Sequence, residues 1–225
     1  KRFMVQTRIE IAKDPELLEK AERAGFKLLL IGIESPHDRI LKQLSKGFNQ
    51  QQVRKAFNIL NRYSFFIHGY FIYGNIGETE EEMIYIAKFA KELKLDTISF
   101  QKLRVEKFSP LIDVVENTPG YYHYRIGGPV FSDRYDRKAL KRIRNRIRAD
   151  FYDFEQVRLI LQKVYKSQLL KIGEVVSVLL PLPDVTIRSG DQLILEDTPT
   201  QLKEYEQVLG ATLYSGESAV DEDHP

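Results

Sequence analysis

Apolar runs of strand length alternate with helical segments over the first hundred residues, and this alternation constrains the fold more than any other feature. The runs cover residues 3–11, 27–34, 65–73 and 96–103. Strands that alternate with helices predict right-handed βαβ units and a parallel sheet. Because four strands are too few to close an eight-stranded barrel, we predict an α/β fold arranged as a partial (β/α) barrel of about four parallel strands.

The helices between these strands carry their own start and stop signals. Asp14 and Pro15 supply an N-cap and a first helical residue, and Gly25 suits the end of that helix. Thr79 followed by Glu82 forms a capping box that opens a helix running to about residue 93. Two further helices are predicted over residues 38–46 and 50–63.

Charge and amino-acid composition divide the rest of the chain into parts. A loop rich in Gly, Pro and Tyr at residues 117–129 precedes two predicted helices, at about 136–150 and 153–166. Residues 167–225 carry 3 basic and 11 acidic side chains, which leaves 31 of the 34 basic and 21 of the 32 acidic residues for 1–166. We therefore predict three parts: a partial barrel (1–110), a basic loop and helical extension (111–166), and a small acidic α+β domain (167–225).

Two absences exclude whole classes of protein. The sequence has no cysteine, which excludes disulfides, thiolate-bound zinc or iron–sulfur clusters, and a thiol nucleophile within these 225 residues. No run of about 18 apolar residues is present, so we predict no membrane span. We expect a soluble, cytoplasmic protein without a signal peptide.

Polar residues gather where the predicted strands end. Glu10 follows the first strand, Glu34 and Ser35 follow the second, and residues 75–78 follow the third. Two carboxylates beside a glycine loop suit hydrogen bonding to a ribose, an ammonium group or a metal, because the carboxyl ends of parallel strands share one edge. Capping of helices, or pairing with Lys and Arg, explains the carboxylates equally well.

The segment GYFIYGNIGE, residues 69–78, places glycines at the end of a buried strand, where they let a ligand approach the backbone. A tight turn into the following helix accounts for the same glycines. The segment is neither a P-loop nor a GxGxxG dinucleotide turn.

Taken in order, these motifs resemble the second half of the barrel core of radical S-adenosylmethionine (SAM) enzymes, especially the cobalamin-associated branch. The resemblance rests on VQTRIEI, LLLIGIES, DRILKQLSKG, FFIHGYFIYGNIGETEEE and DTISFQKL over residues 3–110, and the extension to about 166 is similar to the tail of that branch. It implies a SAM site in which Glu34, and Glu10 with Arg8 beside it, hold the ribose and the amino-acid part. It further implies that Lys46 meets the SAM carboxylate and that residues 69–78 lie along the adenine. The residues implied to bind SAM are Arg8, Glu10, Glu34, Ser35, Lys46, Gly69, Ile72, Gly74, Gly77 and Glu78. Lys46 is explained equally well as a charge at a helix C-terminus.

The sequence departs from this family in one decisive respect. Radical SAM enzymes hold a [4Fe–4S] cluster in a CxxxCxxC loop, and this chain has no cysteine. We therefore predict a fragment that keeps part of the SAM-binding edge of the sheet and generates no radical by itself. The resemblance implies that a missing N-terminal half would complete it, and it allows cobalamin in the full-length family. A homo-oligomer is the alternative to a missing half as partner.

A second resemblance concerns residues 170–214. The run VTIRSGDQLILEDTPTQLKEYEQVLGATLY is similar to the C-terminal domain of regulator-of-potassium-conductance (RCK) modules. It implies a regulatory, ligand-binding or dimerisation module of potassium transport. A generic small α+β domain explains the same pattern.

A third hypothesis, nucleic-acid binding, rests on eight basic residues and one acidic residue between Arg134 and Arg148. The cations spread around more than one helix face and no aromatic residues interleave with them. A solvated helix, or one that pairs with the acidic domain, is therefore favoured over a nucleic-acid partner. The tyrosines at 121, 122 and 124 are interpreted as loop packing, and the four histidines lack metal-ligand spacing.

Overall fold

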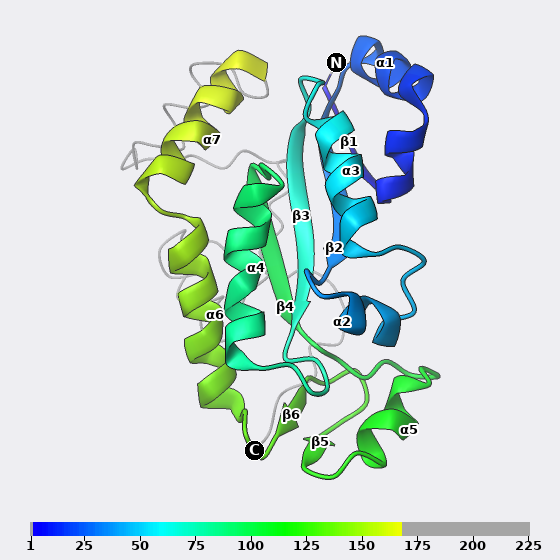
Figure 1. Cartoon of the computed structure of the whole chain (residues 1–225), viewed down its shortest axis with the longest axis vertical. Helices are drawn as coiled ribbons and strands as arrows, with labels where there is room; N and C mark the ends of the chain where they lie inside the picture. The colour runs from blue at the N-terminus through cyan, green and yellow to red at the C-terminus, as the bar shows by residue number, and fades with distance from the viewer. Residues whose placement is uncertain (1, 168–225) are drawn as a thin grey trace, which may run out of the picture. The chain divides into compact units, whose positions relative to one another are not determined.

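The computed structural model describes residues 2–167, and these form an α/β fold around one parallel sheet (Figure 1). The strands are β1 (Phe3–Thr7), β2 (Phe26–Glu34), β3 (Phe66–Tyr73) and β4 (Thr97–Lys102), and they lie in sequence order, all parallel. This confirms the predicted class and the number of parallel strands. The predicted domain over residues 167–225, including the RCK-like run at 170–214, lies outside the described residues apart from residue 167.

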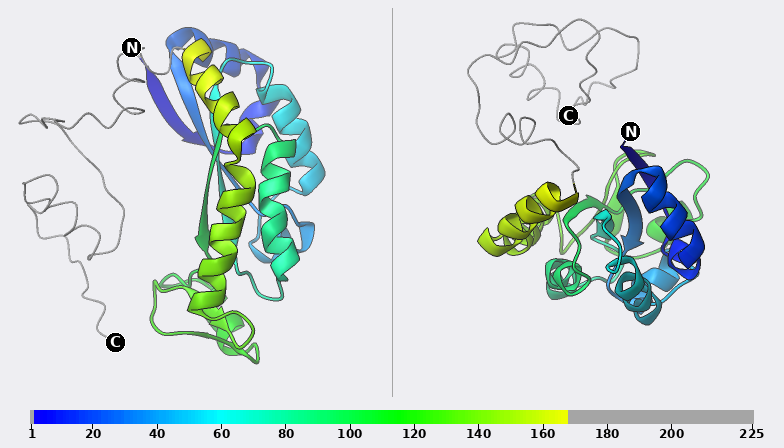
Figure 2. Two further views of the ribbon diagram at one scale, coloured as in Figure 1. Left: turned by 90° about the vertical axis from the view of Figure 1, so that its left-hand side faces the viewer. Right: turned by 90° about the horizontal axis from the view of Figure 1, so that it is seen from above.

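Helices connect β1 to β4, and most of the described helices cover one face of the sheet (Figure 2). In chain order they are η1 (Ile9–Lys13), α1 (Pro15–Ala24), α2 (Asp38–Gln43), α3 (Gln50–Leu60), α4 (Glu80–Glu92), α5 (Leu111–Glu116), α6 (Arg137–Phe151) and α7 (Phe154–Ser167). Side chains of β2 and β3 alternate accordingly: Leu29, Ile31 and Ile67 are fully buried under the helices. Leu30 and His68, on the opposite face of the sheet, are only half-buried. We call this second face the inner face.

The local helix signals are confirmed. The Asp14 carboxylate accepts a hydrogen bond from the Leu17 N–H (2.9 Å), and Gly25 closes α1 with a φ of 95°. Thr79 and Glu82 form both bonds of the capping box at the start of α4. Each cap satisfies backbone groups that have no partner inside the helix.

The first predicted strand is too long. Residues 3–11 alternate like a strand, but β1 ends at Thr7 and a 3₁₀ turn, η1, follows. Ile9 and Ala12 are buried and lie three residues apart, which places them on one side of that turn. Burial of this pair beside α3 therefore overrides the period-2 pattern of the sequence.

The segment predicted as a loop also contains regular structure. Helix α5 is followed by an antiparallel hairpin of β5 (Tyr121–His123) and β6 (Val130–Ser132). Strands of three residues are too short for a periodic signal. Beyond the hairpin, the inward face of α6 joins the same core as the sheet, through Leu140, Ile143, Ile147 and Phe151.

The two edges of the sheet differ. At β1, Phe3 and Met4 are 42% and 62% exposed. At β4, the Tyr152 hydroxyl donates to the carbonyl of Ile98 (2.9 Å) and accepts from its N–H (3.0 Å). An edge strand otherwise offers such groups to other chains, so Tyr152 protects the β4 edge in the way that natural sheets commonly require.

We expect Tyr152→Phe to lower the free energy of unfolding by about 1–2 kcal/mol, because two backbone groups lose their partner while the ring stays packed. Urea denaturation measures this. Tyr63→Phe is the matched control: its ring stacks on Phe65, and its hydroxyl makes no hydrogen bond with the described residues. Equal losses in the two variants would show that the edge contact contributes nothing.

None of the helices within residues 2–167 is long and apolar enough to span a membrane.

Candidate functional site

Glu34 ends β2 at the carboxyl edge of the sheet in an unusual conformation. Its φ of 70° is left-handed, and the pairing register with β3 shifts between Gly32 and Glu34. A Cβ atom on Gly32 would lie 2.7 Å from Glu34 Oε1, so the carboxylate folds back over the glycine. A left-handed residue that is not glycine costs of order 1–3 kcal/mol, and such strain concentrates at functional sites.

Lys46 meets this carboxylate. Its Nζ donates to Glu34 Oε1 at 2.8 Å, and the Glu34 side chain is only 16% exposed. Lys46 comes from the turn after α2, which is tightened by Ser45 at a φ of 53°. The structure thus brings together two predicted site residues as one partly buried ion pair.

Ser35, Arg8 and Glu10 have other surroundings. Ser35 is fully buried, and its hydroxyl accepts from the His37 N–H at 3.1 Å, so it fixes the entry to α2. Arg8 donates to Glu10 Oε1 at 3.3 Å; Arg8 is exposed and Glu10 is half-buried. Glu10 lines a cavity of about 230 Å³ between η1 and α3, which reaches Gly47 beside Lys46. Its Oε2 is buried without a hydrogen-bond partner in the described structure.

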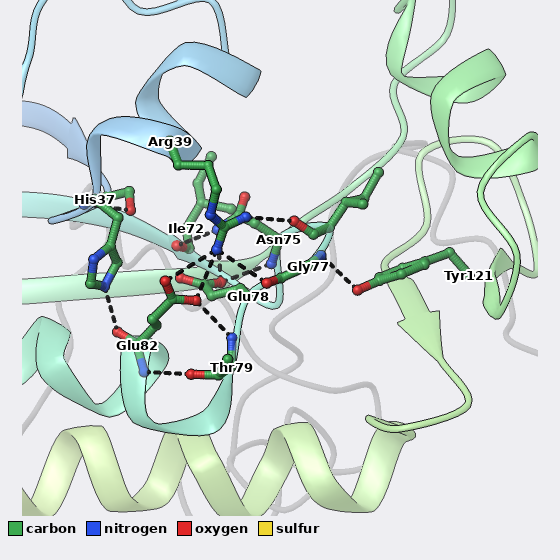
Figure 3. A network of polar contacts seen from close by, with 11 residues as sticks. His37, Arg39, Ile72, Asn75, Gly77, Glu78, Thr79, Glu82 and Tyr121 are labelled. Atoms are coloured by element: carbon green, nitrogen blue, oxygen red, sulfur yellow. Dashed lines mark hydrogen bonds and ion pairs between the residues drawn. The ribbon is translucent and has the colours of Figure 1, made fainter.

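The turn from β3 to α4 is built around a buried Asn–Glu pair (Figure 3). Gly74 and Gly77 have φ values of 76° and 71°, which glycine adopts readily. Between them Asn75 is 3% exposed, and Glu78, next along, is 2% exposed. The N–H and the Nδ2 of Asn75 both donate to Glu78 Oε2, at 2.8 and 2.9 Å. Nδ2 also donates to the carbonyl of Ile72, which fixes the orientation of the amide.

Two buried oxygens in this turn lack a donor. Asn75 Oδ1 and Glu78 Oε1 have no hydrogen-bond partner among the described residues. Burial raises the pKa of Glu78, and the hydrogen bonds from Asn75 oppose this only in part. A buried acceptor without a donor is costly, so the turn is suited to a ligand that supplies N–H or O–H groups.

Three elements hold the turn in place (Figure 3). Arg39 of α2 donates to the carbonyls of Ile76 (3.3 Å) and Gly77 (3.1 Å), and it pairs with Glu82 of α4 at 2.9 Å. The Gly77 N–H donates to the Tyr121 hydroxyl of β5 at 2.7 Å. The turn is therefore a rigid rim. Sequence reasoning missed Arg39 and assigned Tyr121 to loop packing.

A second cavity, of about 440 Å³, opens beside this rim. It lies between the end of α2, the β3–α4 turn and the start of α5, and it is lined by Gln43, Leu44, Ser45, Asn75, Ile76, Leu103, Ser109, Pro110, Leu111 and Val114. Its size falls within the usual range for small-molecule sites, and its lining is mostly apolar with a few polar groups.

Gly69 and Ile72 lie within β3. A Cβ on Gly69 would come within 2.6 Å of Leu95 and 3.1 Å of Ile33, so close packing explains this glycine. Ile72, on the inner face, packs with the small apolar cluster around Leu103. Within residues 2–167 no group of three or more His, Asp or Glu side chains is placed to hold a metal ion.

Comparisons with known proteins concern mainly the first part of the chain. The family model of the radical SAM superfamily matches residues 3–90. Among curated proteins, the bacteriochlorophyllide d C-12(1)-methyltransferase of Chlorobaculum tepidum is 26% identical over 136 residues, which is 60% of this chain and 28% of that protein. The uncharacterized methyltransferase PH0819 of Pyrococcus horikoshii is 35% identical over 79 residues, 35% of this chain and 17% of that protein. The chain therefore spans less than a third of either relative.

Two solved structures are similar at 16% identity. Elp3 of Methanocaldococcus infernus has a TM-score of 0.47, with 51% of this chain and 28% of that chain covered. The radical SAM methyltransferase TsrM of Kitasatospora setae, with cobalamin and a [4Fe–4S] cluster bound, has a TM-score of 0.45, with 57% and 27% covered. Together with the family model, the β2 and β3 motifs identify residues 3–90 as similar to part of a radical SAM superfamily domain.

Proposed function

We propose that residues 3–110 bind SAM at the carboxyl edge of the sheet. The observation that carries the proposal is the Lys46–Glu34 ion pair, which lies over Gly32 at the strained end of β2. SAM carries a carboxylate, an ammonium group and a ribose diol, and an ion pair offers both kinds of partner that these groups need. Ligands of parallel α/β sheets bind at this edge.

The neighbouring groups suit the rest of the ligand. Lys46 would pair with the SAM carboxylate, and Glu34 would accept from the ammonium group or from the ribose. The free acceptors of Asn75 and Glu78 suit N–H donors such as the amino group of adenine. The 440 Å³ cavity lined by Asn75 is large enough for a nucleoside.

The residues present fit SAM but not an iron–sulfur cluster. The cluster needs thiolates, and the 225 residues contain none. We therefore propose binding, and no radical step, for this polypeptide. The names of the two curated relatives support methyl transfer as the reaction of a whole protein that contains such residues. Cobalamin is part of the TsrM structure, and we assign it no residue here.

Calorimetric titration of the chain with SAM tests the proposal. We expect Lys46→Met to weaken SAM binding about tenfold or more, because a charge-assisted hydrogen bond to the carboxylate is lost. The same variant should bind methylthioadenosine, which lacks the amino-acid part, as well as the unchanged chain does. Lys42→Met, an exposed lysine of α2, is the matched control.

Two results would contradict the proposal. A folded chain that releases or absorbs no heat on titration with millimolar SAM would show that the chain does not bind SAM. If Lys42→Met and Lys46→Met weakened SAM binding equally, Lys46 would have no specific role in binding. Thermal melting of each variant separates loss of binding from loss of fold.

A further inference from the structure

The cations of α6 sort onto two faces of the helix, although the sequence alone spreads them. Arg142 pairs with Glu80 of α4 at 2.7 Å, and Arg146 pairs with Asp150 at 2.8 Å. The remaining face carries a stripe at intervals of four, three and four residues, which places its members in one row along the helix. We call Arg137, Lys141, Arg144 and Arg148 the α6 stripe. All four are exposed, and no acidic side chain within residues 2–167 forms an ion pair with any of them.

Two members of the stripe, Arg137 and Arg144, act electrostatically on a cation of the sheet. Lys102 ends β4, opposite Tyr73 of β3, and is half-buried. Burial lowers the pKa of Lys102, and the charges of Arg137, Arg144 and Arg104 lower it further. Arg104 pairs with Glu106 only at 3.8 Å. Positive groups from the sheet, the following segment and α6 thus share one region, which repels further cations and attracts anions.

An aromatic surface borders this region. The Lys102 ammonium lies 5.4 Å from the centre of the Phe131 ring. Phe131 in turn lies 5.5 Å from Tyr124 and 6.0 Å from Tyr122, measured between ring centres. Tyr124 is 79% exposed. The β5–β6 hairpin therefore supplies an exposed aromatic ring, whereas Phe151 of α6 is buried.

Acidic residues near the hairpin do not neutralise the stripe. Asp133 and Asp136 act on the Tyr122 hydroxyl, and the Asp136 carboxylate caps α6 by accepting from the Ala139 N–H at 2.7 Å. Both precede the first turn of α6, whereas the stripe runs to Arg148 near its end. These two carboxylates therefore lie at the start of the helix, away from Arg148.

We propose that the α6 stripe and the Tyr124 ring bind a single-stranded nucleic acid. Phosphates would follow the stripe past Lys102, and a base would stack on Tyr124. Single-strand sites combine cations with an exposed aromatic ring, because every base offers a flat face and every nucleotide a phosphate. Here the cations of the stripe have no ion pair within residues 2–167, and Tyr124 supplies the ring. A duplex keeps its bases stacked, so it would use the charges without the ring.

Fluorescence anisotropy with short labelled oligo(dT) and oligo(U), measured on the full chain over a range of salt, tests this. Binding should weaken steeply with salt, with a slope near −0.7 for each phosphate neutralised. Arg144→Gln should weaken binding and reduce that slope by about 0.7. Arg146→Gln removes the same charge from the opposite face and should change neither quantity. Tyr124→Ala should weaken binding about fivefold to hundredfold at an unchanged slope.

Several results would overturn the proposal. These are no binding at low salt, equal effects of Arg144→Gln and Arg146→Gln, or a Tyr124→Ala variant that binds normally. Vesicles containing phosphatidylglycerol provide a separate arm: stripe-dependent binding to them, without a contribution from Tyr124, would identify a membrane surface instead. Circular dichroism of each variant confirms that the fold is kept, so a loss of binding is attributable to the surface.

Discussion

Leu140→Ala should lower the free energy of unfolding by about 2–5 kcal/mol, the range found when a buried leucine leaves a cavity. Leu140 is 1% exposed on the inward face of α6. It also lies against the rim, because a Cβ on Gly74 would come within 3.2 Å of its side chain. The loss should therefore loosen the β3–α4 turn as well as α6.

Urea denaturation of the full chain measures this change. Leu17→Ala in α1 is the matched control, because the same atoms are removed from a side chain that is 47% exposed. We expect that control to stay within about 0.5 kcal/mol of the unchanged chain. If both variants lost the same small amount of unfolding free energy, the described packing of α6 against the sheet would be contradicted.

Substitution of Glu78 should also change the free energy of unfolding strongly. We expect Glu78→Ala to cost roughly 1–3 kcal/mol more than Glu78→Gln, because only glutamine keeps an acceptor for the buried Asn75 N–H. Urea denaturation of the two variants at one pH measures the difference. Equal stabilities would show that water satisfies the Asn75 N–H in the alanine variant.

A comparison of Glu78→Gln with the unchanged chain should reveal a pH dependence of stability. Burial raises the pKa of Glu78 above its usual value of 4.5, so the folded chain holds this proton more tightly than the unfolded chain. The free energy of unfolding should therefore fall as pH rises from about 4.5 through the raised pKa. Glu78→Gln has no proton to lose, so its stability relative to the unchanged chain should increase over that window and then level off. Burial also raises the pKa of Asp96, but that contribution is common to both proteins and cancels. A difference that is constant with pH would contradict the assignment.

Helix ends were predictable because they depend on residues close in sequence. Asp14 caps the N–H three residues later, and Thr79 and Glu82 satisfy each other across the same distance. The end of β1 was not predictable in this way. Ile9 and Ala12 leave the strand pattern because of the helix that covers them, and that helix begins at Gln50.

Of the candidate site, the sequence indicated some single residues but not their arrangement. The sequence pointed to Glu34 and Lys46 separately, with pairing between carboxylates and lysines as one general alternative. Their particular contact depends on the register shift between Gly32 and Glu34 and on the turn after α2. Arg39 and Tyr121 reach Gly77 from 38 and 44 residues away, and no local pattern indicates such contacts. The α6 cations show the same limit only for Arg142, because no local pattern indicates that Glu80, 62 residues away, pairs with it. The pair of Arg146 with Asp150 follows from helical spacing.

The sequential order of the sheet has a consequence for how the chain folds. Each strand pairs with the next one in sequence, so that Met4 meets Leu28, Leu28 meets Phe66 and His68 meets Thr97. Every pairing therefore closes one crossover between consecutive strands, which holds one or two α-helices, and no strand pairs with one that is distant in the sequence. Because loop-closure entropy and contact order set folding rates, this sheet can grow one unit at a time while the chain leaves the ribosome. Each new strand adds to an edge that its predecessor has already formed.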